Sequence, residues 1–221
     1  AHLDRGLAVA QEGSPRRVRL LLVRSQCRQE LGQAEAAAAD ARAALEGATA
    51  LGHAGLLARA HRTLALLHLW IGPPDEVEAH ARLAITLAEG GVDPSVAFWA
   101  HWSLGALWGM TGRTADMARA IEEVRALAGR LRSPVLRLWA DELAVELAYA
   151  TGRWDQGIAV GEGAIALARA LNQRALLPRL LVWTSLFHLG RGDQARAHAL
   201  VDEACRISGM HDPGPWDVHL V

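Results

Sequence analysis

A glycine-centred turn recurs at an almost constant spacing along this chain of 221 residues, and this spacing constrains the fold more than any other feature. The five turns contain Leu31-Gly32, Ile71-Gly72, Thr111-Gly112, Thr151-Gly152 and Leu189-Gly190, so their glycines are 40, 40, 40 and 38 residues apart. A period between about 20 and 50 residues is typical of repeat arrays, in which each unit buries its apolar face against its neighbours. The sequence therefore predicts a repeat protein rather than a single closed core.

Each repeat carries two helix boundaries. Glycine after an apolar run is a common helix C-cap because it accepts positive φ. An acidic residue follows three positions later in four of the five turns, where it suits the positive end of the next helix. Between these turns, Ser14-Pro15, Asp93-Pro94 and Ser133-Pro134 each pair an N-cap residue with proline at the first helical position. Two boundaries per period predict two helices per repeat.

The resulting map places five helix pairs along the chain. The predicted pairs are 15–31 and 34–50, 55–71 and 74–89, 94–110 and 114–130, 134–150 and 154–170, and 173–189 and 192–208. We expect residues 1–12 to form the second helix of a truncated preceding repeat and residues 13–208 to form the helical-repeat domain. Residues 209–221 contain Pro213 and Pro215 and are expected to be a C-terminal tail or cap.

The amino-acid composition favours helices and argues against a nucleic-acid-binding or membrane-spanning protein. Hydrophobic residues make up 51% of the chain, mostly Ala and Leu, which are strong helix formers. The net charge is −1, without the basic stripe that a nucleic-acid-binding domain normally carries. Two cysteines in separate segments suggest free thiols, and no apolar run reaches the ~18 residues of a membrane span. We therefore expect a cytoplasmic protein that does not bind nucleic acid directly.

Small residues at fixed positions in each repeat resemble the tetratricopeptide-repeat (TPR) family. Counted from the turn glycines, the first-helix position holds Ser25, Ala65, Gly105, Val145 and Trp183. The second-helix positions hold Ala37 and Ala44, Val77 and Ala84, Met117 and Val124, Gly157 and Ala164, and Ala195 and Asp202. The resemblance implies an all-α, right-handed α-α superhelix of about five repeats. Trp183, Met117 and Asp202 depart from the pattern, so looser packing is expected around them.

The period of 40 is longer than the usual TPR period of about 34. It resembles the longer-helix variant found in MalT-like and LuxR-type bacterial regulators. HEAT repeats also run near 40 residues, but the Leu-Gly turns and alanine-rich second helices favour TPR. The resemblance implies a non-catalytic module that binds a protein or peptide, or a second copy of itself, within a larger bacterial signalling or transcription-regulatory protein. The alternative is a small-molecule sensor, for example of a sugar.

First helices line the concave face of such proteins, and this implies a set of binding residues. The candidates are Arg59, Arg62, Trp99, Trp102, Trp139, Glu142, Glu146, Tyr149, Thr184 and Phe187. Tryptophan is enriched at binding hot spots, and the arginines opposite the glutamates would polarise a groove. The alternative is that the tryptophan stripe is packed core. We expect Trp102 to line the groove and Trp108 to lie in the core.

The remaining motifs give no sign of catalysis. No nucleophile–base arrangement is visible, and the histidines lack a metal-ligand spacing with a third ligand nearby. Gly157, Gly161 and Gly163 lie inside a predicted helix and follow no strand, so they do not form a phosphate-binding loop. Close helix approach would explain Gly157 and Gly161, whereas the sequence gives no reason for Gly163. The sequence predicts neither an enzyme nor a metal or cofactor site.

Overall fold

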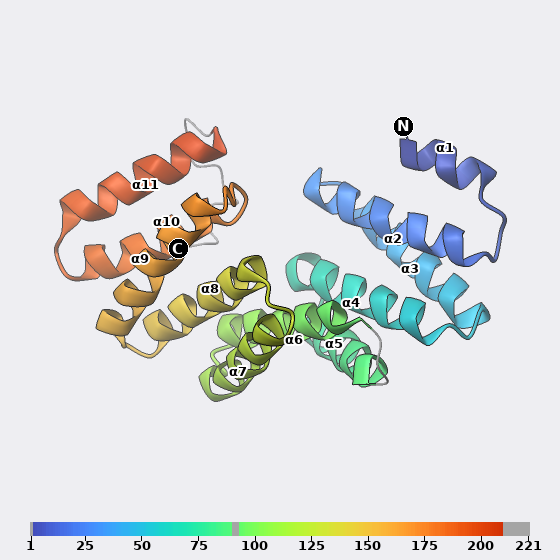
Figure 1. Ribbon diagram of the computed structural model, residues 1–221, viewed down its shortest axis with the longest axis horizontal. Coiled ribbons are helices and arrows are strands. Elements are labelled where there is room, and N and C mark those ends of the chain that lie inside the picture. Colours follow the sequence, from blue (N-terminus) through green and yellow to red (C-terminus); the bar gives the residue numbers. More distant parts are fainter. Residues whose placement is uncertain (1, 90–92, 210–221) are drawn as a thin grey trace. The chain divides into compact units, whose positions relative to one another are not determined.

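The computed structural model of the protein describes residues 2–89 and 93–209. Within these ranges every regular element is an α-helix and there is no strand (Figure 1). The all-α prediction is therefore confirmed. No helix in the described ranges has the length and apolar character needed to cross a bilayer.

The described residues form eleven helices, which follow one another along the chain. They are α1 (His2–Val9), α2 (Pro15–Glu30), α3 (Ala34–Ala50), α4 (Ala54–Ile71), α5 (Pro74–Glu89), α6 (Pro94–Met110), α7 (Thr114–Arg130), α8 (Pro134–Ala150), α9 (Trp154–Ala170), α10 (Leu177–Gly190) and α11 (Gln194–Ser208).

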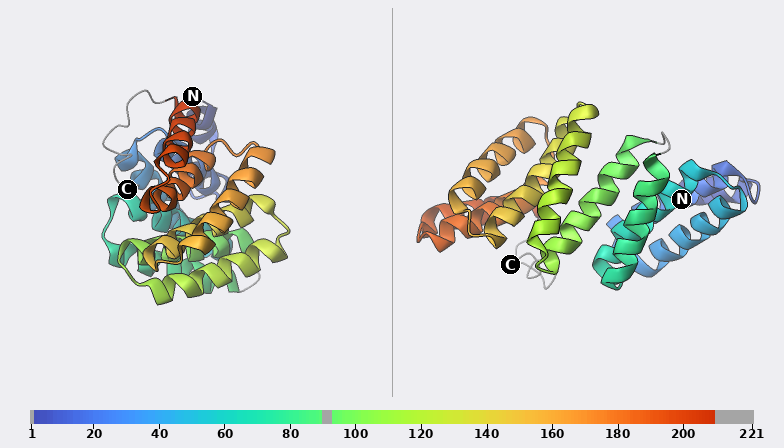
Figure 2. Two further views of the ribbon diagram at one scale, coloured as in Figure 1. Left: turned by 90° about the vertical axis from the view of Figure 1, so that its left-hand side faces the viewer. Right: turned by 90° about the horizontal axis from the view of Figure 1, so that it is seen from below.

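The helices pack in successive pairs within two compact units, Ala1–Leu107 and Trp108–Val221, whose boundary falls in α6. In the first unit α2 packs on α3 and α4 on α5. In the second unit α8 packs on α9 and α10 on α11. Figures 1 and 2 show the two helices of each pair running back along each other. First helices of neighbouring pairs also touch, α2 with α4 and α8 with α10, so they form one layer in each unit.

Local capping explains most helix boundaries. The Ser14 and Ser133 hydroxyls accept hydrogen bonds from the backbone N–H groups of Arg17 at 3.3 Å and Leu136 at 3.2 Å. Three of the turn glycines, at positions 32, 112 and 152, adopt positive φ values of 71°, 72° and 69°. Gly72 departs from this pattern with φ −116°. Serine caps thus begin helices, and left-handed glycines end them, where the sequence predicts.

The last repeat has a different register from the one predicted. Gly192, with φ 80°, forms its left-handed turn, whereas Gly190 is the final residue of α10. Gly190 is small for another reason, since a Cβ there would overlap the Trp154 ring. The turn positions are therefore 32, 72, 112, 152 and 192, with a uniform period of 40.

This register removes two of the predicted departures from the TPR pattern. In this register, the positions at which the TPR pattern has small residues hold Ser185, Ala197 and Ala204 in the last repeat, and all three are buried. The assignment of Trp183 and Asp202 to these positions was wrong. Met117 does occupy a small-residue position, and it is fully buried there.

The first helix of the last repeat, α10, begins later than predicted, at Leu177 instead of residue 173. Pro178 accounts for the difference. A helix starting at 173 would place this proline beyond its first turn, where it would lack an N–H group and clash with the preceding turn. In the observed helix, Pro178 lies in the first turn, where proline is tolerated.

Candidate functional site

The corrected register changes which side chains of α10 share a face with the predicted binding positions of α8. The equivalent positions are Arg179, Val182, Leu186 and Leu189, all of which are partly or well exposed. The predicted positions Thr184 and Phe187 are fully buried instead. The prediction that these two residues line a binding face was wrong.

Thr184 and Phe187 instead pack against glycines of the preceding helix, α9. A Cβ at Gly157 would overlap the Phe187 ring, and a Cβ at Gly161 would overlap the Thr184 hydroxyl. Close helix approach, as predicted, therefore explains both glycines. Gly163 is exposed and has no atom near its missing Cβ, so packing gives no reason for it.

We call the shared face of the two first helices in the second unit the α8–α10 stripe. It consists of Trp139, Glu142, Glu146 and Tyr149 of α8 and Arg179, Val182, Leu186 and Leu189 of α10. The helices α8 and α10 are in contact, and the Glu142–Arg179 hydrogen bond joins the two rows of residues. Two large apolar side chains in it are well exposed, Tyr149 at 40% and Leu189 at 52%.

Tyr149 is held in place by three aromatic neighbours. Its ring stacks parallel to Trp154 at 6.5 Å and makes edge contacts with Trp183 at 5.9 Å and Phe187 at 5.6 Å, measured between ring centroids. Such aromatic pairs stabilise defined ring orientations. Tyr149 therefore offers an exposed but ordered ring, which loses little entropy on binding a partner.

The charged groups of the stripe are close to neutral in sum. Glu142 is fully buried, and its Oε1 accepts hydrogen bonds from Nε of Arg179 at 3.1 Å and from Nη2 of the same guanidinium. Burial, assisted by the nearby Glu142 charge and opposed by Arg179, raises the pKa of Glu146 from 4.5 to about 8. At pH 7 Glu146 is thus mostly protonated, while Glu142 and Arg179 neutralise each other.

The candidates in the first unit lie partly on the surface and partly in the core. Arg59 forms an ion pair with Asp93 at 3.0 Å. Arg62 is half-buried, and burial lowers its pKa, with the positive charge of Arg59 adding to the effect. The Trp99 and Trp102 rings meet edge to face at 5.8 Å. Trp102 is only 3% exposed, so the expectation that it lines an open groove was wrong.

Trp108 is buried, as expected of a core residue. The structure does not support the predicted polarised groove, which was to lie between Arg59 and Arg62 on one rim and the glutamates on the other. Arg59 is paired with Asp93 and Glu142 with Arg179, each inside its own unit. These charges are already compensated and provide little field to orient a ligand.

A histidine cluster between α4 and α5 was not anticipated. The Nδ1 atoms of His61 and His80 are 2.9 Å apart, the His68 ring meets His80 edge-on at 5.5 Å, and His68 Nδ1 lies 2.5 Å from Glu76 Oε2. Burial, together with the charges of His61 and His68, lowers the pKa of His80 to about 4. In the described part of the chain, no group of three or more His, Cys, Asp or Glu residues has a metal-binding arrangement.

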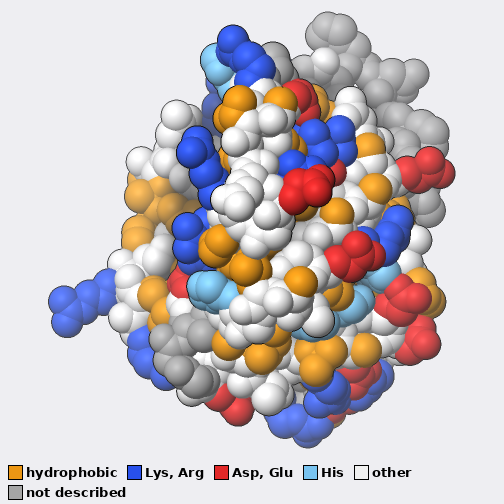
Figure 3. Space-filling model, turned by 90° about the vertical axis from the view of Figure 1, so that its right-hand side faces the viewer, with side chains coloured by type: hydrophobic (Ala, Val, Ile, Leu, Met, Phe, Trp, Pro, Cys, Tyr) orange, Lys and Arg blue, Asp and Glu red, His pale blue; other side chains and the backbone are white. Residues whose placement is uncertain are grey.

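Two cavities lie at equivalent turns of successive repeats in the second unit, one between α7 and α8 and one between α9 and α10. Neither has an aromatic residue in its lining. Elsewhere, the face shown in Figure 3 carries interspersed acidic, basic and apolar side chains. This mixture matches the dispersed charge of the sequence.

No known protein family description matches the sequence, and no curated protein is similar to it in sequence. Solved structures do match. Aspartyl phosphate phosphatase F from Bacillus subtilis superimposes with a TM-score of 0.71 at 13% identity over 87% of this chain, which spans only 50% of that protein. BtubC (BKLC) from P. vanneervenii superimposes with a TM-score of 0.70 at 22% identity, covering 97% of this chain and 95% of the other.

These likenesses show the fold and nothing finer. The neighbours are helical-repeat proteins, so the TPR-like helical-repeat prediction is confirmed. The MalT-like and LuxR-type assignment stays a prediction, because it rests on the period alone.

Proposed function

We propose that the chain is a non-catalytic module that binds a protein partner through the α8–α10 stripe. The observation that carries the proposal is the exposure of Tyr149 and Leu189 at the ends of neighbouring first helices. Large apolar groups exposed on neighbouring helices commonly mark interaction sites. The helical-repeat fold of the two structural neighbours supports a binding role, since this architecture presents extended surfaces.

The chemistry of the stripe favours an apolar peptide segment as the occupant. Its buried Glu142–Arg179 pair and largely protonated Glu146 leave little net charge at pH 7. Partly exposed Val182 and Leu186 lie between the charged pair and Leu189 along α10. An amphipathic helix or an extended apolar segment matches such a strip, because both bury apolar side chains at regular spacing.

We further propose that this module belongs to a larger bacterial signalling or transcription-regulatory protein in the cytoplasm. The 40-residue period supports this context. The name of the Bacillus neighbour describes a phosphatase, but a likeness at 13% identity carries the fold only. A small-molecule sensor would be favoured by an aromatic-lined enclosed pocket, and neither described cavity has an aromatic lining.

A pair of leucine substitutions tests the stripe. Peptides selected from a random displayed library against the protein should be apolar. Tyr149→Ala or Leu189→Ala should weaken their binding by about tenfold or more, as expected for hot-spot residues. Leu83 of α5 is the matched control, because it is 48% exposed but lies on a second helix of the other unit.

Leu83→Ala should leave the affinity unchanged. Equal losses for Leu83→Ala and Leu189→Ala in a binding titration would contradict a specific stripe. Selection of only charged peptides would contradict the proposed apolar occupant.

A further inference from the structure

An open cavity at the turn between α7 and α8 has three arginines in its lining. Its volume is about 540 Å³, and we call it the α7–α8 cavity. Its lining consists of Arg125, Ala128, Gly129, Arg132, Ser133, Pro134, Arg137 and Asp141. Three guanidinium groups thus surround it with a single carboxylate, a net charge of +2 from three positive groups and one negative group.

One carboxylate is shared between two of the arginines. Arg125 Nη2 lies 3.2 Å from Asp141 Oδ1, and Arg137 Nε lies 3.6 Å from Asp141 Oδ2. Arg132 adds a third guanidinium from the turn itself, and all three arginine side chains are exposed. Each guanidinium has five N–H donors, so these exposed arginines have more donors than the single carboxylate of Asp141 can accept.

The backbone of Arg132 is held in an unfavourable conformation. Its φ is 48°, in the left-handed region where a Cβ is crowded and glycine is favoured. Gly52, two periods earlier, has the same role with φ 58°, and Asn172, one period later, has φ 51°. Local conformation gives no reason for an arginine at this position. A residue kept in a disfavoured conformation is frequently a functional one.

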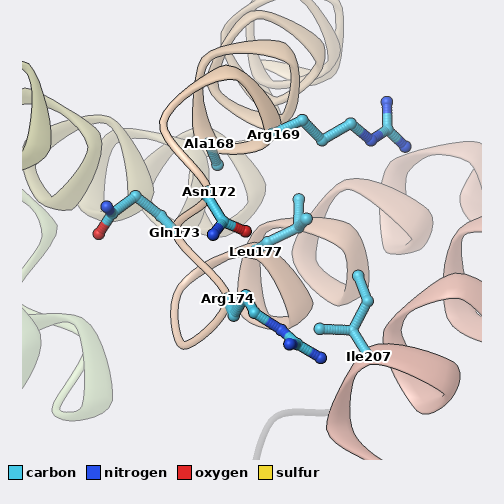
Figure 4. A pocket seen from close by; sticks show the side chains of 7 residues that line it. All are labelled: Ala168, Arg169, Asn172, Gln173, Arg174, Leu177 and Ile207. Carbon is cyan, nitrogen blue, oxygen red and sulfur yellow. The ribbon is translucent and has the colours of Figure 1, made fainter.

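The equivalent cavity of the next repeat has two arginines, Arg169 and Arg174, and no carboxylate in its lining, but among the described residues only Arg174 lacks an acidic partner, so one uncompensated guanidinium remains there. This cavity measures about 220 Å³ and is lined by Ala168, Arg169, Asn172, Gln173, Arg174, Leu177 and Ile207 (Figure 4). Asn172 stands where the first cavity has Arg132, and Leu177 stands where it has Arg137. Figure 4 shows the Arg169 side chain extending away from Asn172, and this guanidinium is paired with Glu203 at 2.6 Å.

We propose that the α7–α8 cavity is a binding site for a phosphate-ester group. A phosphoryl dianion carries close to two negative charges at pH 7, which matches the net +2 of the lining better than a single carboxylate does. Planar guanidinium groups bind phosphate oxygens through paired N–H donors. The site is separate from the α8–α10 stripe, because the two share no residue. It gives the protein a second and charge-selective ligand.

The test uses the whole chain with three probes: inorganic phosphate, O-phosphoserine, and a short peptide containing one phosphoserine. Calorimetric titration at low salt should show binding of the two esters, weakening as salt is raised. The key variant is Arg132→Gly, which removes the charge and also relieves the left-handed strain. It should weaken ester binding at least tenfold while raising the thermal midpoint.

Asn172→Gly is the matched control, since it relieves the same strain at the equivalent turn without touching the charge. It should raise the thermal midpoint and leave ester binding unchanged. Arg137→Gln, which leaves the turn intact, should also weaken binding. The proposal is overturned if neither ester binds, if Arg132→Gly binds like the unmodified chain, if Asn172→Gly loses affinity equally, or if only inorganic phosphate binds. Binding of O-phosphoserine but not of the phosphopeptide identifies a small phosphorylated ligand, and the reverse identifies a phosphoprotein.

Discussion

At the scale of single residues, packing requires two of the three glycines of α9 but not the third. Gly157 and Gly161 are covered by fully buried side chains of α10, and the missing Cβ atoms create the room for them. Gly163 lies two residues further on and faces open space. Sequence alone cannot distinguish these cases, because glycine lowers helix propensity equally at all three positions.

Alanine substitutions in α9 should therefore act in opposite directions. Gly163→Ala should stabilise the protein by about 0.5–1 kcal/mol, because alanine restricts the unfolded chain and suits a helix interior. Gly157→Ala should destabilise it by about 1–3 kcal/mol, because the Phe187 ring is buried and has to move. Urea unfolding of the two variants measures both effects. Shifts of the same sign would show that the α9–α10 contact is not as tight as the structure indicates.

At the scale of elements, the helices were predictable where their ends are set locally. The predicted helices at 34–50 and 134–150 coincide with α3 and α8, because turn glycines and a Ser-Pro cap mark their ends. The start of α10 was not predicted, because no serine or aspartate precedes it. The penalty for Pro178 inside a helix was the available signal.

The binding face was harder to predict than the helices. A helix turns by about 100° per residue, so a register error of two residues rotates the assigned face by about 200°. Choosing Gly190 instead of Gly192 therefore assigned the buried Thr184 and Phe187 to the binding face in place of the partly exposed Leu186 and the exposed Leu189. The uniform period of 40 was the signal that could have corrected it. Burial of Trp102 and Glu142, by contrast, depends on neighbouring side chains that a repeat pattern does not specify.

The histidine pair between α4 and α5 predicts an acid-sensitive contact. The pKa of His80 is lowered from 6.5 to about 4. Between these pH values the imidazole is therefore neutral in the folded protein and protonated in the unfolded chain. This contribution to stability is present above pH 6.5 and is lost as the pH falls through 4. His80→Asn should therefore flatten the rise of stability between these values. Denaturant unfolding at several pH values measures it.

His198→Asn is the control for this measurement, because His198 is exposed on α11. Its stability should follow the unmodified protein at every pH. If His80→Asn loses as much stability toward acidic pH as the unmodified protein does, the close Nδ1 contact does not govern the protonation of this pair.

At the scale of the whole molecule, the two units carry buried ionisable groups whose effects on stability oppose each other. In the first unit the neutral histidines favour folding at higher pH. In the second unit Glu146 favours folding at lower pH, because its protonated form is the one that fits. The two effects oppose each other between about pH 4.5 and 6.5, the region in which both groups titrate. Above pH 6.5, the change attributable to these groups comes from Glu146.

This window gives the prediction for Glu146. Its pKa is about 8 in the folded protein and 4.5 for the ordinary carboxyl group, so the folded state binds more protons between these values. The free energy of unfolding should fall as the pH rises across that range, and the stabilisation is lost through pH 8. Glu146→Gln keeps a neutral side chain at all pH values, so it should remove the fall between pH 6.5 and 8. Glu122→Gln, at an exposed position of α7, should leave the fall intact.

The Glu146→Gln substitution also links stability to the proposed function, because ionisation of Glu146 places a charge in the α8–α10 stripe. An apolar peptide should bind the unmodified protein more weakly at pH 9 than at pH 6.5, and Glu146→Gln should reduce that difference. Equal pH dependence of binding in both proteins would show that Glu146 does not contribute to the face that the peptide contacts.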